Sequence, residues 1–576
     1  MRIVGIHDGH NSAVSLLIDG EIVSAVQEER LVSTKNFFGF PIEAFKKTLE
    51  INSLKNDDID FIAYHGHHIP YPLDRMEKME NYRESYSTKA AIKHLLRSTF
   101  IYDMYKKQRE KDRIEKVVNL GIPEEKIKFV EHHSAHASAA YYGCPWVDRN
   151  EKVLVLTQDG AGDGLSGTVN IGYKGKIERI ASIAEEDSLG RIYATTTFMM
   201  GMVPLEHEYK LMGMAPYAPD NGREMSYQVF TDLLEFPEED SIIWKRKSKH
   251  PPMQRIYPYL RENTEFHRFD WIAAGLQQYT EEMLVRWVRN CIKKTGIGDV
   301  VLSGGTFMNV KANQRIYEMP EVDKLFIFPS CGDESNCIGA VYSLYNELEQ
   351  DKPSRPIETL YLGPDETDDI NTKKEIEKFG EETEVEFTSE YVDNIEKRIA
   401  KLLADGEVVA RCKGPMEFGA RALGNRSILS DPSDLDKIRV VNNMIKKRDF
   451  WMPFAPVMLK ERSDEYIENP KKMEAPYMII TFNSTDKYKE FIGGVQQKDL
   501  TARPQIITEK QNKNYYDILK EFEEMTGKGV LINTSFNLHG LPIVYGPKEA
   551  LYVFENSGLN YLALGNYLLE KKEKTV

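Results

Sequence analysis

Short apolar runs separated by turn residues open the chain. Residues 3–7, 13–18 and 22–26 are apolar enough to form strands, and the pairs Asp8-Gly9 and Asp19-Gly20 fall between them. Aspartate followed by glycine favours tight turns, because both residues tolerate positive φ angles. The pattern predicts a unit of three short strands joined by a loop and a hairpin turn.

The same order of elements returns later in the chain. An apolar strand at 153–157 is followed by the glycine-rich run 159–164, by apolar residues 167–172, by a Lys174-Gly175 turn and by residues 177–180. Two such units predict a duplicated α/β domain with its active site between the halves, as in the actin-like ATPases and sugar kinases. The alternative is that the two sets of hairpins are coincidental.

The remaining pattern suggests an insertion and a second domain. Residues 76–120 are rich in Lys, Glu and Arg with interspersed apolar residues, which predicts a helical insertion with a solvated charged face. A polar, proline-containing stretch at 350–356 marks a domain boundary. We therefore expect a first domain at 1–350 and a second α/β domain at 356–576.

Composition narrows the class of protein. The 576 residues are 41% hydrophobic and 29% charged, with a formal net charge of −15. This balance argues against broad binding to nucleic acid or an anionic membrane, although a local basic cleft is allowed. No signal peptide or membrane-spanning run is recognisable, so we expect a cytoplasmic protein. The five cysteines are scattered without a Cys-x-x-Cys motif, which argues against a disulfide framework.

A pair of histidines suggests a metal site. His132 and His136 are four residues apart, so they share one face of a helix, and Asp333 follows a distant apolar run. Together they match a two-histidine, one-carboxylate ligand set with open positions. His133 is a rival ligand. The alternative is that the histidines form an ordinary helix surface and cap.

Two glycine-rich loops and a basic segment suggest anion binding. The loops at 159–164 and 302–309 each follow an apolar strand, where glycine lets backbone amides approach a phosphate or ribose. In the second domain, Arg421 and Arg426 lie among small residues and polar donors, a composition suited to bidentate phosphate binding. Surface ion pairs are the alternative, and they suit residues 446–448 better than the two arginines.

The motifs HHSAH, HEYKLMGMAPY, LSGGTFMN, CGDES, EFGARALGNRSIL, FWMPFAPVML, ARPQ and NTSFNLHGLPIV occur in this order along the chain. Together they resemble the O-carbamoyltransferases of the nodulation-protein and antibiotic-biosynthesis type. The resemblance implies an N-terminal domain similar to the actin-like threonylcarbamoyltransferases and a YrdC-like C-terminal domain. It also implies a reaction in which carbamoyl phosphate and Mg-ATP form carbamoyl-adenylate, whose carbamoyl group then passes to a hydroxyl of a sugar or other small metabolite.

The resemblance also implies roles for individual residues. It assigns a divalent metal, usually Fe²⁺, to His132, His136 and Asp333, and active-site positions to His10, Lys35 and Asp159, with His10 as the candidate base. It assigns the nucleotide to Gly304, Gly305 and Asn309. For carbamoyl phosphate and ATP in the second domain, the corresponding residues are Arg421, Arg426, Ser427, Lys447, Arg503 and Asn533.

Other functions stay open at this point. A sugar-kinase-like phosphotransferase would use only the first domain's nucleotide cleft, and a tRNA threonylcarbamoyltransferase would require a broader basic surface than this acidic chain offers. The ligand set alone also suits an iron oxygenase, and a non-catalytic binding protein is conceivable. We expect a small-molecule acceptor, no nucleic acid or membrane partner, and a homodimer as one possible assembly.

Overall fold

The computed structural model of the protein describes residues 1–72, 75–84, 87, 100–433, 439, 442 and 449–572. The chain forms two compact units. The first comprises Met1–Glu28 and Asn36–Glu358, and the second comprises Glu29–Lys35 and Thr359–Val576. The short segment Glu29–Lys35 thus belongs to the second unit although its flanking residues belong to the first, an arrangement that the hydrophobic pattern does not reveal.

The first unit contains two five-stranded sheets of the same topology. One has the order β3-β2-β1-β4-β5 and the other the order β8-β7-β6-β11-β12. In each, the three consecutive strands are antiparallel and the last two pairs are parallel. The predicted duplication of an α/β unit is therefore confirmed. The strands are β1 (Arg2–His7), β2 (Ala13–Ile18), β3 (Glu21–Gln27), β4 (Phe61–His65), β5 (Ile127–Val130), β6 (Val153–Gly162), β7 (Leu165–Tyr173), β8 (Lys176–Ala184), β11 (Asp299–Ser303) and β12 (Lys324–Ile327).

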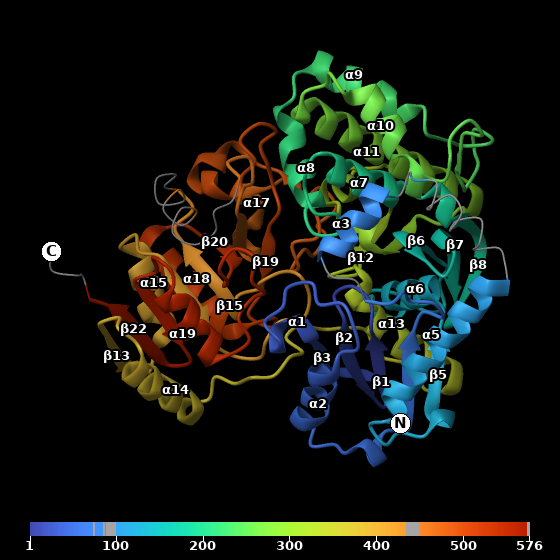
Figure 1. The fold of residues 1–576 in the computed structure, drawn as a ribbon. Helices are drawn as coiled ribbons and strands as arrows, with labels where there is room; N and C mark the ends of the chain where they lie inside the picture. The colour runs from blue at the N-terminus through green and yellow to red at the C-terminus, as the bar shows by residue number, and fades with distance from the viewer. Residues whose placement is uncertain are drawn as a thin grey trace. The chain divides into compact units, whose positions relative to one another are not determined.

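Two helices lie between these sheets. Helix α13 (Asn336–Leu348) packs on β1, β2 and β4, helix α6 (His132–Gly143) packs on β6, β7 and β11, and the two helices pack on each other (Figure 1). Both are rich in small or apolar residues; α6 is almost wholly buried, and α13 is buried over most of its length. This central layer places the N-terminus of α6 beside the ends of β6 and β11, where the predicted site residues lie.

Further helices surround the paired sheets. Helix α2 (Ile42–Ile51) packs on β2 and β3, and α7 (Leu189–Met199) packs on β6. The others in this unit are α3 (Arg75–Glu84), α5 (Phe100–Val118), α8 (Glu208–Met214), α9 (Asp220–Thr231), α10 (Tyr257–Thr264), α11 (Phe269–Thr295) and α12 (Val310–Tyr317), with a two-stranded ribbon of β9 (Leu234–Glu235) and β10 (Lys245–Arg246).

The described part of the charged insertion has the predicted solvated face, with Asp103, Lys111 and Glu115 exposed, but two of its arginines are buried. Arg109 and Arg113 of α5 are 1% and 0% exposed. Both form salt bridges at 3.0 Å with the buried carboxylate of Asp8, in the loop after β1. The four-residue spacing of the two arginines places both guanidinium groups on one face of α5. That face anchors the loop that carries His10.

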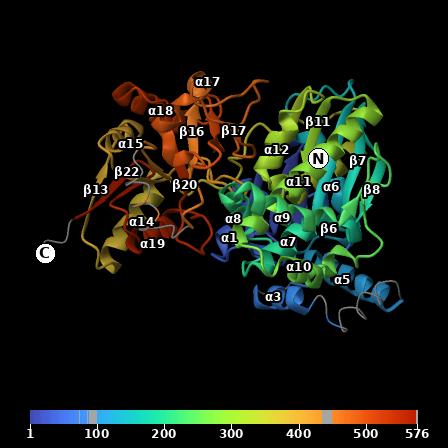
Figure 2. The same ribbon diagram turned by 90° about the horizontal axis from the view of Figure 1, so that it is seen from above.

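The second unit is built on one eight-stranded sheet in the order β13-β22-β21-β14-β15-β20-β16-β19. Helices α15 and α18 cover one face, and α14 and α19 cover the other (Figure 2). Neighbouring residues of one strand point to opposite faces, since Val409 belongs to one core and Ala410 to the other. This arrangement confirms a second α/β domain.

The bounds of its main elements are α14 (Asp369–Glu382), β13 (Phe387–Tyr391), α15 (Ile395–Ala404), β14 (Val409–Cys412), β15 (Arg426–Ser430), β16 (Ala455–Leu459), β19 (Gln505–Ile507), α18 (Lys513–Thr526), β20 (Val530–Ser535), α19 (Pro547–Glu555), β21 (Tyr561–Leu564) and β22 (Tyr567–Lys571). The short elements are α1 (Glu28–Leu31), α17 (Ser463–Tyr466), β17 (Phe482–Asn483) and β18 (Thr501–Ala502). Of the helices described, none is long and apolar enough to cross a bilayer.

Candidate metal centre and anion-binding site

The N-terminus of α6 presents two histidines to one point. The carboxylate of Glu131 caps the helix by accepting hydrogen bonds from the backbone amides of His133 and Ser134. His132 and His136 follow one turn apart, with side chains that are almost fully buried. The pattern that predicted a shared helical face is therefore realised in the fold.

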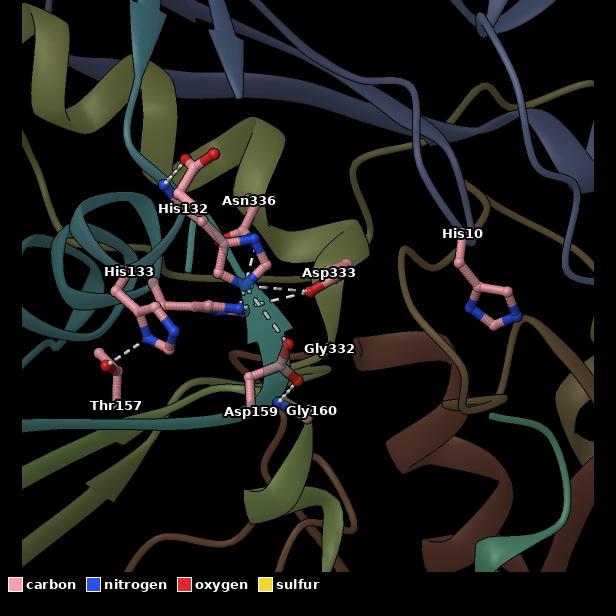
Figure 3. Close-up of polar contacts among 12 residues, drawn as sticks. His10, His132, His133, Thr157, Asp159, Gly160, Gly332, Asp333 and Asn336 are labelled. Atoms are coloured by element: carbon pink, nitrogen blue, oxygen red, sulfur yellow. Dashed lines mark hydrogen bonds and ion pairs between the residues drawn. The ribbon is translucent and has the colours of Figure 1, made fainter. Parts of the chain in front are cut away.

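Two carboxylates from other elements meet these imidazoles. Asp159 lies near the end of β6, and Asp333 begins the 3₁₀ turn before α13. Nε2 of His132 lies 3.3 Å from Oδ2 of Asp159 and 3.7 Å from Oδ1 of Asp333, and Nε2 of His136 lies 3.4 Å from the latter atom (Figure 3). One ligand atom from each of the four residues falls within 4.8 Å of all the others.

This group fits a divalent cation. The buried Nε2 of His132 and Oδ1 of Asp333 have no hydrogen-bond partner among the described residues. Two imidazoles and two carboxylates form a mixed nitrogen and oxygen set, which suits Fe²⁺, Mn²⁺ or Zn²⁺. Burial alone would lower the pKa of His132, but Asp333 and Asp159 outweigh it and raise this pKa to about 9. The carboxylates thus concentrate negative charge where a cation would sit.

Asp159 belongs to the same group of candidate metal ligands, and its predicted catalytic role stays a prediction. Its Oδ2 faces His132, and its Oδ1 accepts a hydrogen bond of 3.0 Å from the backbone amide of Gly305. Burial would raise the pKa of Asp159, yet the neighbouring histidines, His132 foremost, hold it below its ordinary value. The position suits a fourth ligand as well as it suits a group that polarises a substrate.

His133 points away from this cluster. Its Nδ1 lies 2.8 Å from the hydroxyl oxygen of Thr157, and it is not one of the four clustered residues. Burial, followed by the charges of His132 and His136, lowers the pKa of His133 to about 3. A neutral imidazole hydrogen-bonded to a buried threonine is a structural feature, so the geometry disfavours the rival ligand.

The residues predicted to bind a nucleotide lie beside the cluster. Gly304 has a φ of +110°, and a Cβ atom there would lie 2.3 Å from the carbonyl oxygen of Gln158. Gly305 bonds to Asp159, as described above. Asn309 caps α12, since its Oδ1 accepts from the amide of Ala312, and its Nδ2 donates to Gln277. Much of its side chain is therefore committed to the protein, and nucleotide contact by these residues stays a prediction.

His10 and Lys35 lie outside the cluster. His10 is half-buried in the loop between β1 and β2, and Figure 3 shows it well apart from the four clustered side chains. Lys35 is exposed and belongs to the segment Glu29–Lys35 of the second unit. Their catalytic roles stay predictions.

The sequence did not reveal a carboxylate that binds the backbone at the start of α6. The carboxylate of Asp163 accepts hydrogen bonds from the backbone amides of His132, His67 and His68 at 2.9, 3.0 and 2.8 Å. The motif Gly162-Asp163-Gly164 had suggested a phosphate loop. In the fold the Asp163 carboxylate fixes the backbone of the first metal-ligand candidate, and phosphate binding by this loop stays a prediction.

In the second unit, Arg426 is a fully buried arginine at the start of β15. Its Nε donates to the carbonyl of Tyr545 at 3.0 Å, and its Nη1 donates to the carbonyls of Gly414 and Asn425, both at 2.9 Å. Its Nη2 has no hydrogen-bond partner among the described residues. One end of the guanidinium group is therefore fixed by the protein, and the other retains a buried donor.

Buried side chains hold the backbone of the loop between Arg421 and Arg426. Glu417 accepts from the amides of Leu423 and Arg426 through one carboxylate oxygen. The carbonyl of Leu423 accepts from Tyr361 at 2.7 Å and from Gln505 at 3.0 Å, and the carbonyl of Gly424 accepts from Arg411 at 2.7 Å. We call these supporting side chains the loop cage: Tyr361, Arg411, Glu417, Gln505 and Asn533.

Asn533 contributes an acceptor rather than a donor. Its Nδ2 donates to the carbonyl of Ala422 at 3.0 Å and to Oε1 of Gln505 at 2.9 Å, so both amide hydrogens are used. Because Gln505 must donate its own amide to Leu423, a flipped amide at Asn533 would face two acceptors. The buried Oδ1 has no partner among the described residues. This atom suits an N–H group of a ligand and not a phosphate oxygen.

The other predicted anion-binding residues divide into three cases. Arg421 and Arg503 are half-buried on loops of this unit. Ser427 is buried, and its hydroxyl accepts from the amide of Gly424 at 2.9 Å, so it supports the loop. Lys447 lies outside the described residues.

Comparison with known proteins shows the family to which the chain is similar. Residues 2–342 match the family model "Carbamoyltransferase N-terminus", and residues 400–571 match "Carbamoyltransferase C-terminus". Nodulation protein NolNO of Sinorhizobium fredii is 30% identical over 98% of this chain and 79% of its own length. Nodulation protein NolO of Bradyrhizobium diazoefficiens is 31% identical over 77% of this chain and 79% of its own. The uncharacterized protein MJ1051 of Methanocaldococcus jannaschii is 30% identical over 99% of both chains.

Solved structures match over smaller parts and at low identity. Full-length HypF in a phosphate- and nucleotide-bound form is 15% identical, with a TM-score of 0.36 over 61% of this chain and 56% of its own. The ROK hexokinase of Thermus thermophilus is 14% identical, with a TM-score of 0.28 over 60% of this chain and 100% of its own.

Proposed function

The chain belongs to the carbamoyltransferase family, and on this premise we propose that it is an ATP-dependent O-carbamoyltransferase that works in two steps. In the first step the second unit forms carbamoyl-adenylate from carbamoyl phosphate and Mg-ATP. Carbamoyl phosphate gives its phosphoryl group to water as inorganic phosphate, and the carbamate oxygen attacks the α-phosphorus of ATP and releases pyrophosphate. In the second step the first unit transfers the carbamoyl group to a hydroxyl of a sugar or other small metabolite, and AMP leaves.

Arg426 and the loop cage support the first step. Arg426 offers a buried donor at Nη2, and Asn533 and Glu417 each offer a buried acceptor, Oδ1 and Oε2, without partners among the described residues. A carbamoyl group carries one carbonyl oxygen and an NH₂ group, so it matches one donor and two acceptors. The half-buried Arg421 and Arg503 would neutralise phosphate oxygens, where a guanidinium group binds in bidentate fashion.

The metal centre supports the second step. His132, His136, Asp159 and Asp333 would hold the ion, which when bound would polarise the carbamoyl carbonyl as a Lewis acid. His10 would take the proton of the acceptor hydroxyl, because an imidazole exchanges protons near neutral pH. Gly304 and Gly305, which lie beside the centre, would contact the nucleotide through their backbone.

The single observation that carries the proposal is the separation of two kinds of chemistry into two units. A cluster of candidate metal ligands lies in the first unit, and a loop that ends at the buried Arg426 lies in the second. A sugar-kinase-like phosphotransferase would require only a nucleotide cleft, and it would leave the loop cage and its unpartnered buried atoms without a function.

The purified protein, loaded with Fe²⁺ and supplied with Mg-ATP and carbamoyl phosphate but no acceptor, tests the first step. Pyrophosphate release and a product with the mass of carbamoyl-adenylate support the proposal. Formation of ADP in place of pyrophosphate would instead indicate a kinase. Omission of carbamoyl phosphate is the control, because pyrophosphate release must depend on it.

A further inference from the structure

Three buried imidazoles form a line that ends at the metal centre. Nδ1 of His7 lies 2.8 Å from Nδ1 of His65, and Nε2 of His65 lies 3.1 Å from Nδ1 of His132. At the far end, Nε2 of His7 lies 2.9 Å from the carbonyl oxygen of His10. All three side chains are almost fully inaccessible to solvent. We call His7, His65 and His132 the histidine relay.

The fold brings these residues together through strand pairing. Strands β1 and β4 are parallel neighbours, and Ile6 pairs with Tyr64, so His7 and His65 end adjacent strands side by side. The next strand, β5, leads directly into α6 and places His132 beyond His65. Two members of the relay thus belong to the first sheet, and the third begins the buried helix α6.

The carbonyl oxygen of His10 determines which ring nitrogen carries the proton in each histidine of the relay. A carbonyl oxygen only accepts, so Nε2 of His7 must donate to His10 and, in the neutral ring, Nδ1 of His7 carries the lone pair. Nδ1 of His65 then donates to His7, and Nε2 of His65 accepts from Nδ1 of His132. In the neutral ring of His132 the lone pair is then on Nε2, the nitrogen that faces Asp159 and Asp333 and that would bind a cation placed between them.

We propose that His7 and His65 are positioning residues that fix the tautomer and ring orientation of His132 for metal binding. The proposal rests on the metal centre of the proposed function. A ligating histidine generally donates its other N–H to a partner that sets its tautomer, and that partner is usually a carboxylate or carbonyl. Here the carbonyl oxygen of His10 sets the tautomer of the ligand through a chain of hydrogen bonds that runs across two neutral imidazoles.

The relay also joins the ligand to the loop that carries the candidate base. Arg113 donates to the carbonyls of His65 and Gly66, both at 2.6 Å, and binds the carboxylate of Asp8. The loop from Asp8 to His10 and the ring of His132 therefore belong to one buried hydrogen-bond network. A shift in that loop would alter the orientation of the metal ligand.

Cobalt binding by the full-length metal-free protein tests this inference without the carbamoyl reaction. Co²⁺ affinity is measured by chelator competition, and the visible d–d spectrum reports ligand geometry. His65→Leu removes the donor and the acceptor, so we expect affinity to fall about 10–100-fold and the spectrum to change. His65→Gln keeps one donor and one acceptor, so it should retain most of the affinity.

Two further variants keep the test decisive. His250 is another buried histidine of the first unit, hydrogen-bonded to Asp232 and remote in sequence from the relay. His250→Leu should leave Co²⁺ binding unchanged, which separates the relay from a general loss of packing. If His65→Leu does not fold, His7→Leu carries the test, because it removes the relay's far end without touching a ligand.

The outcomes distinguish this inference from the proposed function. Wild-type affinity and spectrum in His65→Leu or His7→Leu, with Co²⁺ binding lost in His136→Ala, would overturn the relay and leave the metal centre intact. Failure of the wild type to bind Co²⁺ would overturn the metal centre and the relay together. Pyrophosphate release is assigned to the second unit, and it should therefore be unaffected in His65→Leu. If the wild type releases no pyrophosphate, that result would count against the proposed reaction alone.

Discussion

The imidazole ring of His132 lies directly against Gly162. A Cβ atom at residue 162 would come within 2.0 Å of Cγ of that ring, a distance that real side chains do not adopt. The glycine therefore marks the place where β6 passes under a metal-ligand candidate. Its backbone φ is not positive, so the requirement is for space and not for an unusual conformation.

Gly162→Ala should displace His132 and weaken metal binding. The added methyl group must move either β6 or the imidazole, and loss of a ligand's orientation lowers metal affinity by about 10-fold or more. Gly160→Ala is the matched control, because a Cβ there meets no heavy atom within 4 Å. Titration of both metal-free variants with Co²⁺ checks the prediction, and equal affinities would contradict it.

His136→Ala should abolish stoichiometric metal binding, whereas His133→Gln should retain it. Only His136 belongs to the four clustered residues, and His133 is hydrogen-bonded to Thr157. Metal content after purification and reloading, measured by mass spectrometry, separates the two. Loss of metal from His133→Gln with retention in His136→Ala would reverse the ligand assignment.

The local parts of this arrangement could be predicted from residue patterns. The strand and turn pattern at 3–26 predicted the first three strands, because hairpin chemistry is local. The spacing of His132 and His136 predicted a shared face for the same reason. The function predicted from the motifs is confirmed at the level of the family, that is, carbamoyl transfer.

What the sequence could not show depends on contacts between distant segments. His7 and His65 become neighbours only through the parallel pairing of β1 and β4. Arg109 and Arg113 look like solvated charges until Asp8, about a hundred residues earlier, is placed beneath them. Asn533 looked like a phosphate donor, but its hydrogens are used by Ala422 and Gln505.

Acetyl phosphate should be a poor substitute for carbamoyl phosphate. The two differ by a methyl group in place of NH₂, and the buried acceptor on Asn533 would then face a methyl group. A site built to bond an N–H rejects the analogue that lacks it by about 10³-fold or more. The ATP-dependent release of pyrophosphate with each compound measures the ratio. Comparable rates would mean that the Asn533 oxygen does not recognise the carbamoyl group.

Glu208, at the start of α8, should make the first unit less stable as pH rises. Burial raises the pKa of Glu208 to about 7, whereas an unfolded glutamate titrates near 4.3. The native state therefore holds a proton that the unfolded state releases. Because of this difference, the free energy of unfolding falls between about pH 4.5 and 7 and levels off above that. The loss is on the order of 1–2 kcal/mol, allowing for partial exposure to water.

Glu208→Gln removes this loss, because the amide oxygen can still accept from the backbone amide of Leu205 and cannot ionise. The melting temperature of the variant minus that of the wild type should be larger at pH 8 than at pH 5. Scanning calorimetry at both pH values gives this difference, with the exposed Glu235→Gln as the control. A difference that does not change with pH would refute the buried ionisation of Glu208.

The central claim is the division of labour between the two units, and paired half-reactions test it most directly. We would measure pyrophosphate release without acceptor, and carbamoyl transfer to an acceptor alcohol from supplied carbamoyl-adenylate, in Arg421→Ala and His136→Ala. Arg421→Ala should lose the first activity and keep the second, and His136→Ala should show the reverse. Equal loss of both half-reactions in both variants would contradict the account.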